Sequence, residues 1–258
     1  MNNFEIGVDS SLCGADIQVY GTFHLGDRSI LGNNVTIRGN NVTIGDDFYS
    51  SGGLTVGGGG NVWPSANLAI GNRCTIHNSM LNVCESITIG DDVGLSPHVD
   101  ILTHGFWLSA LEGYPAKFAP VVIESGVIVG WRSLILPGVT IGKNAVVGAQ
   151  SVVTKDLEGG CIYAGGPARF INRIEKPGER DVLGLLDAIL ARYEHVARHH
   201  GVHPSIAVDF PWVQVNRARF NVVDFSFSGA QDEETDDFRD YMRRWGIRLY
   251  TGRPFRSL

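Results

Sequence analysis

The residue of this sequence best suited to acid–base chemistry is His104, in the stretch DILTHGFW at residues 100–107. An imidazole can accept a proton near neutral pH, as the general base for attack by a hydroxyl or an amine must do. His104 follows a strand-like run and is itself followed by Gly105. Because the chain has eight histidines, the surrounding pattern must decide between a catalytic role and an ordinary surface histidine.

The surrounding pattern has a period of six residues. From residue 123 the sequence reads IESGVI VGWRSL ILPGVT IGKNAV VGAQSV VTKDLE, in which every block begins with Ile or Val. The same spacing occurs earlier, with slips, in blocks that begin at Leu31, Ile70 and Ile89. A helix would repeat every 3.6 residues, whereas a period of six fits a short strand and a turn with one inward aliphatic side chain. The repeat predicts a solenoid, with Gly, Asn and Asp at corners of positive φ.

The repeat is interrupted beside His104. Ile101 keeps the period, but the next residue in phase is Ile123, and the spacing of 22 residues from Ile101 to Ile123 is not a multiple of six. The stretch GFWLSALEGYPAKFA, residues 105–119, must therefore leave the coil as a loop with His104 at its base. This position favours a catalytic role for His104.

The stretch ILPGVTIGKNAVVGAQSVVTKD, followed by AGGPARFI, resembles the hexapeptide-repeat acyltransferases, in particular the maltose, galactoside and xenobiotic O-acetyltransferase branch. The resemblance covers roughly residues 1–175. It implies an all-β solenoid, namely a left-handed parallel β-helix of hexapeptide repeats with three hexapeptides per turn. It further implies a homotrimer with active sites at the subunit interfaces and acetyl-coenzyme A (acetyl-CoA) as acyl donor.

The resemblance also implies roles for particular residues. His104 is the expected general base, and the backbone amide of Trp131, from a neighbouring subunit, is the expected donor to the oxyanion. The family commonly has W-I-G where this chain has Ile128-Val129-Gly130, so only a backbone role carries over to Trp131. The residues expected to contact acetyl-CoA are Gly130, Trp131, Ala149, Thr154, Lys155 and Arg169.

The acceptor is expected near Asn78 and Asn82, where the family places an asparagine that bonds the acceptor. Trp107 and Tyr114, in the loop, could stack on a sugar ring, although buried or capping roles for these aromatic side chains are equally compatible with the sequence.

These residues predict an O-acetyltransferase that acts on a carbohydrate hydroxyl by direct transfer, because no Cys or Ser nucleophile is paired with His104. An N-acetyltransferase of a nucleotide-linked amino sugar is the alternative. Several such enzymes have a glutamate after the histidine, where this chain has Gly105, and this difference favours oxygen. A non-catalytic hexapeptide scaffold is a further alternative. Such a scaffold would not need Thr154, Lys155 and Arg169, which are expected to contact acetyl-CoA.

Metal chemistry is not expected. A γ-carbonic anhydrase relative would need three histidines at interface spacing, a pattern that His77, His98 and His104 do not show. The histidines of YEHVARHHGVH lack an acidic or cysteine partner at matching spacing. The GGGG stretch at residues 57–60 has no following G-K-[ST], so we interpret it as an irregular corner of the solenoid and not as a phosphate loop.

Composition and charge argue against several other classes of protein. The net charge of −6 argues against nucleic acid as the main partner. No apolar run approaches the roughly 20 residues that span a bilayer, and the start MNNFEIGVDSS lacks the features of a signal peptide. The four cysteines form no C-x-x-C pair, so we expect reduced thiols and a cytoplasmic location.

Residues 176–258 are predicted to form a small α+β extension. A helical pattern runs from Asp181 to Gly201, two strand-like runs follow, and a second helix is expected at roughly 232–245. The sequence does not indicate what this extension does.

Overall fold

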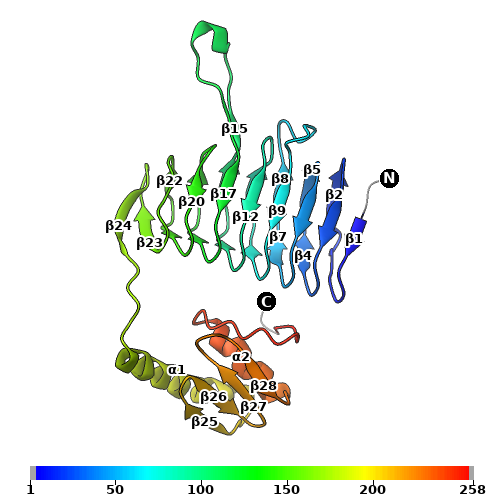
Figure 1. Cartoon of the computed structure of the whole chain (residues 1–258). Coiled ribbons are helices and arrows are strands. Elements are labelled where there is room, and N and C mark those ends of the chain that lie inside the picture. Colours follow the sequence, from blue (N-terminus) through cyan, green and yellow to red (C-terminus); the bar gives the residue numbers. More distant parts are fainter. Residues whose placement is uncertain (1–3, 256–258) are drawn as a thin grey trace. The chain divides into compact units, whose positions relative to one another are not determined.

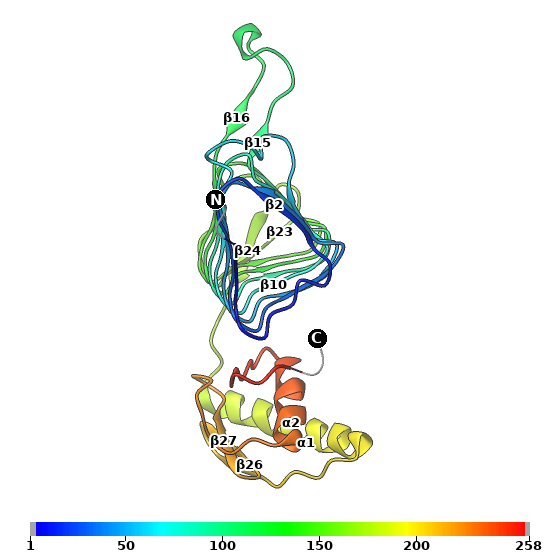
Figure 2. The same ribbon diagram turned by 90° about the vertical axis from the view of Figure 1, so that its right-hand side faces the viewer.

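The computed structural model describes residues 4–255, which divide into a unit that ends at Ile174 and a unit that begins at Glu175. The first unit is a solenoid with three parallel faces, and its three-sided cross-section is visible along the coil in Figure 2. We name the three faces A, B and C, and successive strands along the chain lie on them in turn (Figure 1). The predicted all-β solenoid of short parallel strands is confirmed, while its left hand stays a prediction.

Each face is a ladder of strands two to five residues long. Face A contains, in order, β1 (Phe4–Ile6), β3 (Phe23–Leu25), β6 (Val42–Ile44), β9 (Leu68–Ile70), β12 (Ile87–Ile89), β17 (Val121–Ile123) and β20 (Thr140–Ile141). Face B contains β4 (Ile30–Asn33), β7 (Tyr49–Gly52), β10 (Thr75–Ile76), β13 (Gly94–Leu95), β18 (Ile128–Val129), β21 (Val146–Val147), β23 (Cys161–Ala164) and β24 (Arg169–Arg173). Face C contains β2 (Asp16–Val19), β5 (Thr36–Gly39), β8 (Thr55–Gly57), β11 (Met80–Asn82), β14 (Asp100–Leu102), β19 (Leu134–Ile135) and β22 (Val152–Val153).

The period-six residues form the core. On face C, Ile101 pairs with Ile135, and Ile135 pairs with Val153 in the next coil. All three side chains are fully buried, as are their counterparts on the other faces. Stacking therefore places one aliphatic side chain per face above the next and removes a continuous column of apolar surface from water.

The corners between faces A and B carry a ladder of charges. Arg28, Asp47, Arg73 and Asp92 all have positive φ, between 53° and 58°. Positive φ is unfavourable for arginine. The sequence pattern predicted Gly, Asn and Asp at such corners and did not predict arginine. Arg28 donates two hydrogen bonds to Asp47 at 2.9 and 3.0 Å, and Arg73 donates two to Asp92 at 2.8 Å each. These forked contacts join each strained corner to the next coil and offset its cost.

Ser50 interrupts the aliphatic column of face B. It is fully buried between the coils of Leu31 and Ile76, and its hydroxyl has no hydrogen-bond partner among the residues that the structure describes. An unsatisfied buried polar group costs about 1–3 kcal/mol, so we expect Ser50→Ala to raise the free energy of unfolding by about 1 kcal/mol. Equilibrium unfolding in urea measures this change.

The matched control for this prediction is Ser29→Ala. Ser29 is equally buried, but its hydroxyl donates to the Gly45 carbonyl at 2.9 Å and accepts from the Phe48 amide at 3.0 Å. Its removal should therefore destabilise the solenoid. If both alanine variants lower the free energy of unfolding, an unsatisfied hydroxyl at Ser50 is not the right description.

The second unit has two helices and an antiparallel sheet. Helix α1 (Glu179–His200) ends at Gly201, whose φ is 73°, and α2 (Glu233–Arg243) begins with a capping box between Asp232 and Thr235. The sheet order is β25 (Ile206–Asp209), β26 (Trp212–Val215), β27 (Ala218–Asn221) and β28 (Phe227–Gly229). The predicted small α+β character is thus present, with each of the two strand-like runs folded into a hairpin. Neither described helix is long and apolar enough to cross a membrane.

A buried arginine fixes the end of this unit. Arg239 is fully buried and donates to Asp236 at 3.0 Å and to the carbonyls of Leu249 and Arg253, each at 2.9 Å. Burial lowers the pKa of Arg239. It also opposes ionisation of Asp236, but hydrogen bonds from Arg253 and Arg239 outweigh this effect and hold the pKa of Asp236 below its usual value. The network ties the segment after α2 to the helix.

Candidate active site

His104 lies where the chain turns from face C toward face A. It begins β15 (His104–Gly105), which pairs in antiparallel fashion with β16 (Lys117–Phe118) at the base of the projecting loop (Figure 2). Its Nδ1 is 2.8 Å from Oδ1 of Asn82. With this carbonyl oxygen as acceptor, Nδ1 carries the proton and Nε2 keeps its lone pair. The half-buried imidazole is therefore oriented as a base through Nε2.

Thr103 and two aromatic rings hold this pair in place. The buried Thr103 donates its hydroxyl to the Asn82 carbonyl at 2.6 Å and accepts from the Glu85 amide at 3.0 Å. The ring of Phe118 stacks nearly parallel on His104 at 5.9 Å, and that of Phe106 lies at 5.7 Å. The imidazole is thus fixed by packing on its face and by a hydrogen bond at one edge.

The GGGG stretch lies against the free edge of this imidazole. A side chain at Gly58, where φ is 97°, would place its Cβ 2.2 Å from Nδ2 of Asn82. A Cβ at Gly59 would be 3.5 Å from Nε2 of His104. The stretch does form a corner, but the sequence analysis did not predict its contact with His104. The strand register of face C is what produces this contact. Gly57 pairs with Asn82, and Asn82 pairs with Leu102, which lies two residues before His104.

The predicted acetyl-CoA residues fall into two groups. Thr154 and Lys155 are exposed after β22, at the corner from face C to face A that also carries His104. Trp131 and Ala149 are exposed at the corner from face B to face C, and Arg169 pairs with Ala164 at that end of face B. These two corners are at opposite ends of face C. A single chain therefore does not bring His104 and Trp131 together.

Backbone amides at the second corner differ in their availability. Those of Trp131 and Ala149 donate to no described residue. The Gly130 amide donates to the Val147 carbonyl at 2.7 Å and is not available to pantetheine, so the predicted contact of Gly130 with acetyl-CoA would have to use another atom. Gly130 has a structural reason to be glycine, since its Cβ would be 2.5 Å from the Ala149 nitrogen.

The predicted acceptor residues are also separated. Asn82 contacts His104, whereas Asn78 lies at the other corner, where it adjoins Gly53. Trp107 is 89% exposed in the projecting loop. Several other large apolar side chains of the loop are exposed with it: Phe106, Leu108, Leu111, Tyr114 and Phe118. So much exposed apolar surface on one loop is typical of an interaction surface.

Other chemistries find little support in the described residues. The residues that the structure describes include no group of three or more His, Cys, Asp or Glu side chains that could hold a metal ion. Cys84, at the same corner as His104, is buried, and burial, with a smaller effect of Glu85, raises the pKa of its thiol. A reactive thiolate is therefore disfavoured at Cys84.

The known proteins that this chain is similar to include hexapeptide-repeat transferases. Residues 120–155 match the family described as bacterial transferase hexapeptide (six repeats). The galactoside O-acetyltransferase of Escherichia coli is 35% identical over 129 residues, which cover 49% of this chain and 58% of that enzyme. The 2,3,4,5-tetrahydropyridine-2,6-dicarboxylate N-acetyltransferase of Staphylococcus aureus is 42% identical over 59 residues, 23% of this chain and 25% of that enzyme. This chain thus spans between a quarter and three fifths of these curated relatives.

A solved hexapeptide-repeat acetyltransferase from Vibrio cholerae, complexed with acetyl-CoA, is 25% identical. It aligns over 59% of this chain and 72% of that one, with a TM-score of 0.41. The sequence matches include the coils that follow the His104 loop. The chain belongs to the hexapeptide-repeat acyltransferase superfamily.

Proposed function

We propose that this protein is an acetyl-CoA-dependent O-acetyltransferase that acts on a sugar hydroxyl, with His104 as general base. The observation that carries this proposal is the hydrogen bond between Nδ1 of His104 and Oδ1 of Asn82. It leaves Nε2 unprotonated and facing the side-chain-free position of Gly59. The similarity to a galactoside O-acetyltransferase supports a sugar as acceptor.

In the proposed reaction, Nε2 of His104 takes the proton of the acceptor hydroxyl as its oxygen bonds to the thioester carbonyl carbon. The carbon–sulfur bond then breaks, and His104 returns the proton to the leaving thiolate. Asn82 fixes the tautomer throughout and stabilises the imidazolium that forms. Direct transfer is supported by the raised pKa of the Cys84 thiol, which disfavours an acyl-cysteine at this corner.

The residues that would bind acetyl-CoA fit its chemistry. The exposed amides of Trp131 and Ala149 have no partner among the described residues and can donate to pantetheine, or to the developing oxyanion in the case of Trp131. Lys155 and Arg169 are exposed and form no ion pair with a described residue, so both cations are available to phosphates. The donor supplies the activated acetyl group.

We further propose a homotrimer of left-handed solenoids in which His104 of one subunit meets Trp131 of its neighbour. The separation of these residues by the length of face C supports this assembly, as does the exposed apolar loop. The test is subunit complementation with His104→Ala, which removes the base, and Arg169→Glu, which repels the phosphates. Co-assembly of equal amounts should restore about a quarter of wild-type activity, because random mixing completes that share of interfaces.

The control for complementation is each inactive variant assayed alone at the same total concentration. If mixing restores no activity while sedimentation shows mixed oligomers, then each site is built within one subunit and the interfacial arrangement is wrong.

An amine acceptor is the second candidate, because an N-acetyltransferase is also among the relatives. The experiment that separates the candidates follows thiol release from acetyl-CoA against matched sugars, amino sugars and their nucleotide-linked forms. Turnover of a hydroxyl sugar well above that of the matched amino sugar supports the O-acetyltransferase. The reverse order would replace it with an N-acetyltransferase.

A further inference from the structure

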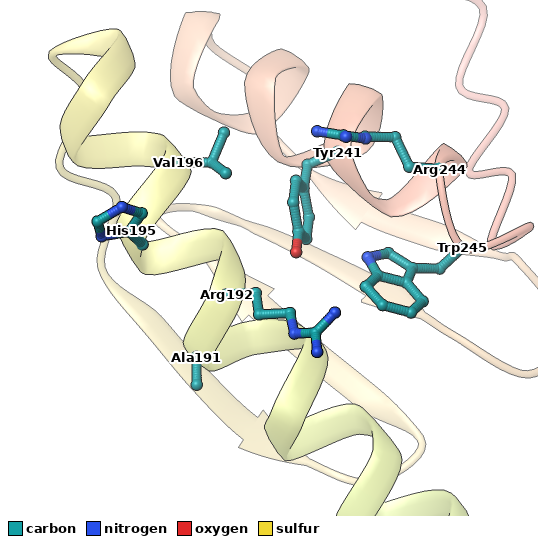
Figure 3. Close-up of a pocket in the computed structure, with 7 residues that line it drawn as sticks. All are labelled: Ala191, Arg192, His195, Val196, Tyr241, Arg244 and Trp245. Atoms are coloured by element: carbon teal, nitrogen blue, oxygen red, sulfur yellow. The ribbon is translucent and has the colours of Figure 1, made fainter.

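The second unit contains a pocket between its two helices that none of the preceding chemistry uses. The pocket has a volume of about 670 Å³, within the range of small-molecule sites. Its lining comes from α1 and from the end of α2: Ala191, Arg192, His195, Val196, Tyr241, Arg244 and Trp245 (Figure 3).

The polar lining of this pocket is rich in hydrogen-bond donors and has no carboxylate. Arg192 and Arg244 supply guanidinium groups, and Trp245 supplies an indole N–H. Neither arginine forms an ion pair with any residue in the described range, unlike Arg219 and Arg239 of the same unit. Two cations without a local counter-charge favour an anionic ligand.

Tyr241 adds a further hydrogen-bond donor to the pocket. Its side chain is only 6% exposed, yet its hydroxyl lines the pocket and makes no hydrogen bond to a described residue. The ring is held at 5.1 Å from that of Tyr193, so the hydroxyl has a fixed position. The hydroxyl therefore opens onto the pocket, where it can donate to a ligand oxygen.

The aromatic rings and the cations are arranged together. The Arg192 guanidinium lies 5.5 Å from the centre of the Trp245 ring, and that of Arg244 lies 5.9 Å from the Tyr241 ring. Figure 3 shows Arg192 reaching from α1 toward Trp245, with the Tyr241 hydroxyl pointing toward α1 beside them. A planar ring can stack on the partly exposed Trp245 while its phosphate meets a guanidinium.

We propose that this pocket binds a small phosphate-bearing ring compound, of the nucleotide or sugar-phosphate class. Phosphate pairs with the two arginines and accepts from the Tyr241 hydroxyl, and the ring packs on Trp245. The proposal is independent of the acetyltransferase activity, because it rests only on residues of the second unit.

The test is isothermal titration of the full-length protein with uridine 5′-monophosphate, glucose 1-phosphate and inorganic phosphate. Comparison of the pocket variants with Arg198→Gln separates binding in this pocket from binding at the phosphate site proposed for coenzyme A. We expect one of the two ring compounds to bind more tightly than inorganic phosphate. The Arg192→Gln/Arg244→Gln double variant should weaken that binding by about 10- to 100-fold, the usual effect of losing charge-assisted hydrogen bonds. Tyr241→Phe, which keeps the ring and its packing, should weaken it by about 3- to 10-fold.

Arg198→Gln is the matched control, since Arg198 is exposed on the same helix and lies outside the pocket. Circular dichroism verifies that each variant is folded. The proposal is overturned if no ring compound binds better than inorganic phosphate, or if the pocket variants bind as tightly as Arg198→Gln.

Discussion

His104→Ala is expected to lower kcat for acetyl transfer by about 10²–10⁴-fold, the usual contribution of a general base. The affinity for coenzyme A should stay unchanged, because His104 is not among the residues proposed to bind the donor. Thiol release with the best acceptor gives kcat, and calorimetry gives the affinity. Asn82→Ala keeps the base and removes the acceptor that orients Nδ1, so its loss should be smaller, about tenfold.

The control for the histidine is His24→Ala. His24 is half-buried on face A, where its Nδ1 is 3.3 Å from a carboxylate oxygen of Glu5. This variant should retain wild-type turnover. Full activity of His104→Ala, in a folded protein with normal coenzyme A affinity, would remove the proposed base and with it the mechanism.

Gly59→Ala is expected to lower kcat/KM by about 100-fold, since a small displacement of reacting groups costs this much. The added methyl would be 3.5 Å from Nε2 of His104, where the acceptor hydroxyl must approach to be deprotonated. Nothing else in the described chain requires glycine here, because Gly59 has no positive φ and its Cβ would make only ordinary contacts. The protein should therefore stay as stable as wild type, or become slightly more stable.

Two measurements separate blocking of the acceptor from damage to the fold. Gly94→Ala, on face B, adds a methyl in open space at ordinary φ and should leave both stability and activity unchanged. Carbethoxylation of His104, followed by mass spectrometry, should slow in Gly59→Ala, because the methyl covers Nε2. If Gly59→Ala is folded and as active as Gly94→Ala, the acceptor does not reach His104 from this side.

The repeat made much of the first unit predictable. Ile101 and Ile135 face inward because each coil repeats the same short strand and turn. The inward position found in one coil therefore applies to the coils stacked on it. His104 could be identified for the same reason, as the residue at which the phase breaks. The arginine corners were not predictable from turn propensity, because the contact that offsets the positive φ of Arg28 comes from Asp47, one coil away.

The site itself depends on contacts between coils of unequal length. Gly57 and Asn82 pair although 25 positions separate them, whereas Ile135 and Val153 are 18 apart. Only the register places Gly59 against His104, and only the next coil decides that the Gly130 amide is already bonded. The pocket of the second unit likewise depends on how α1 and α2 pack, which helical periodicity does not specify.

The strand β24 has a consequence for how copies of this protein can associate. Every other strand of face B runs parallel to its neighbour, so the open edge of such a ladder is a template on which another copy could continue the stack into a filament. β24 reverses direction against β23 and leaves its residues exposed, with Arg169 and Arg173 at its two ends. A reversed, charged last strand disfavours growth of face B along the solenoid axis and so favours association through the sides of the solenoid, where the proposed catalytic corners lie.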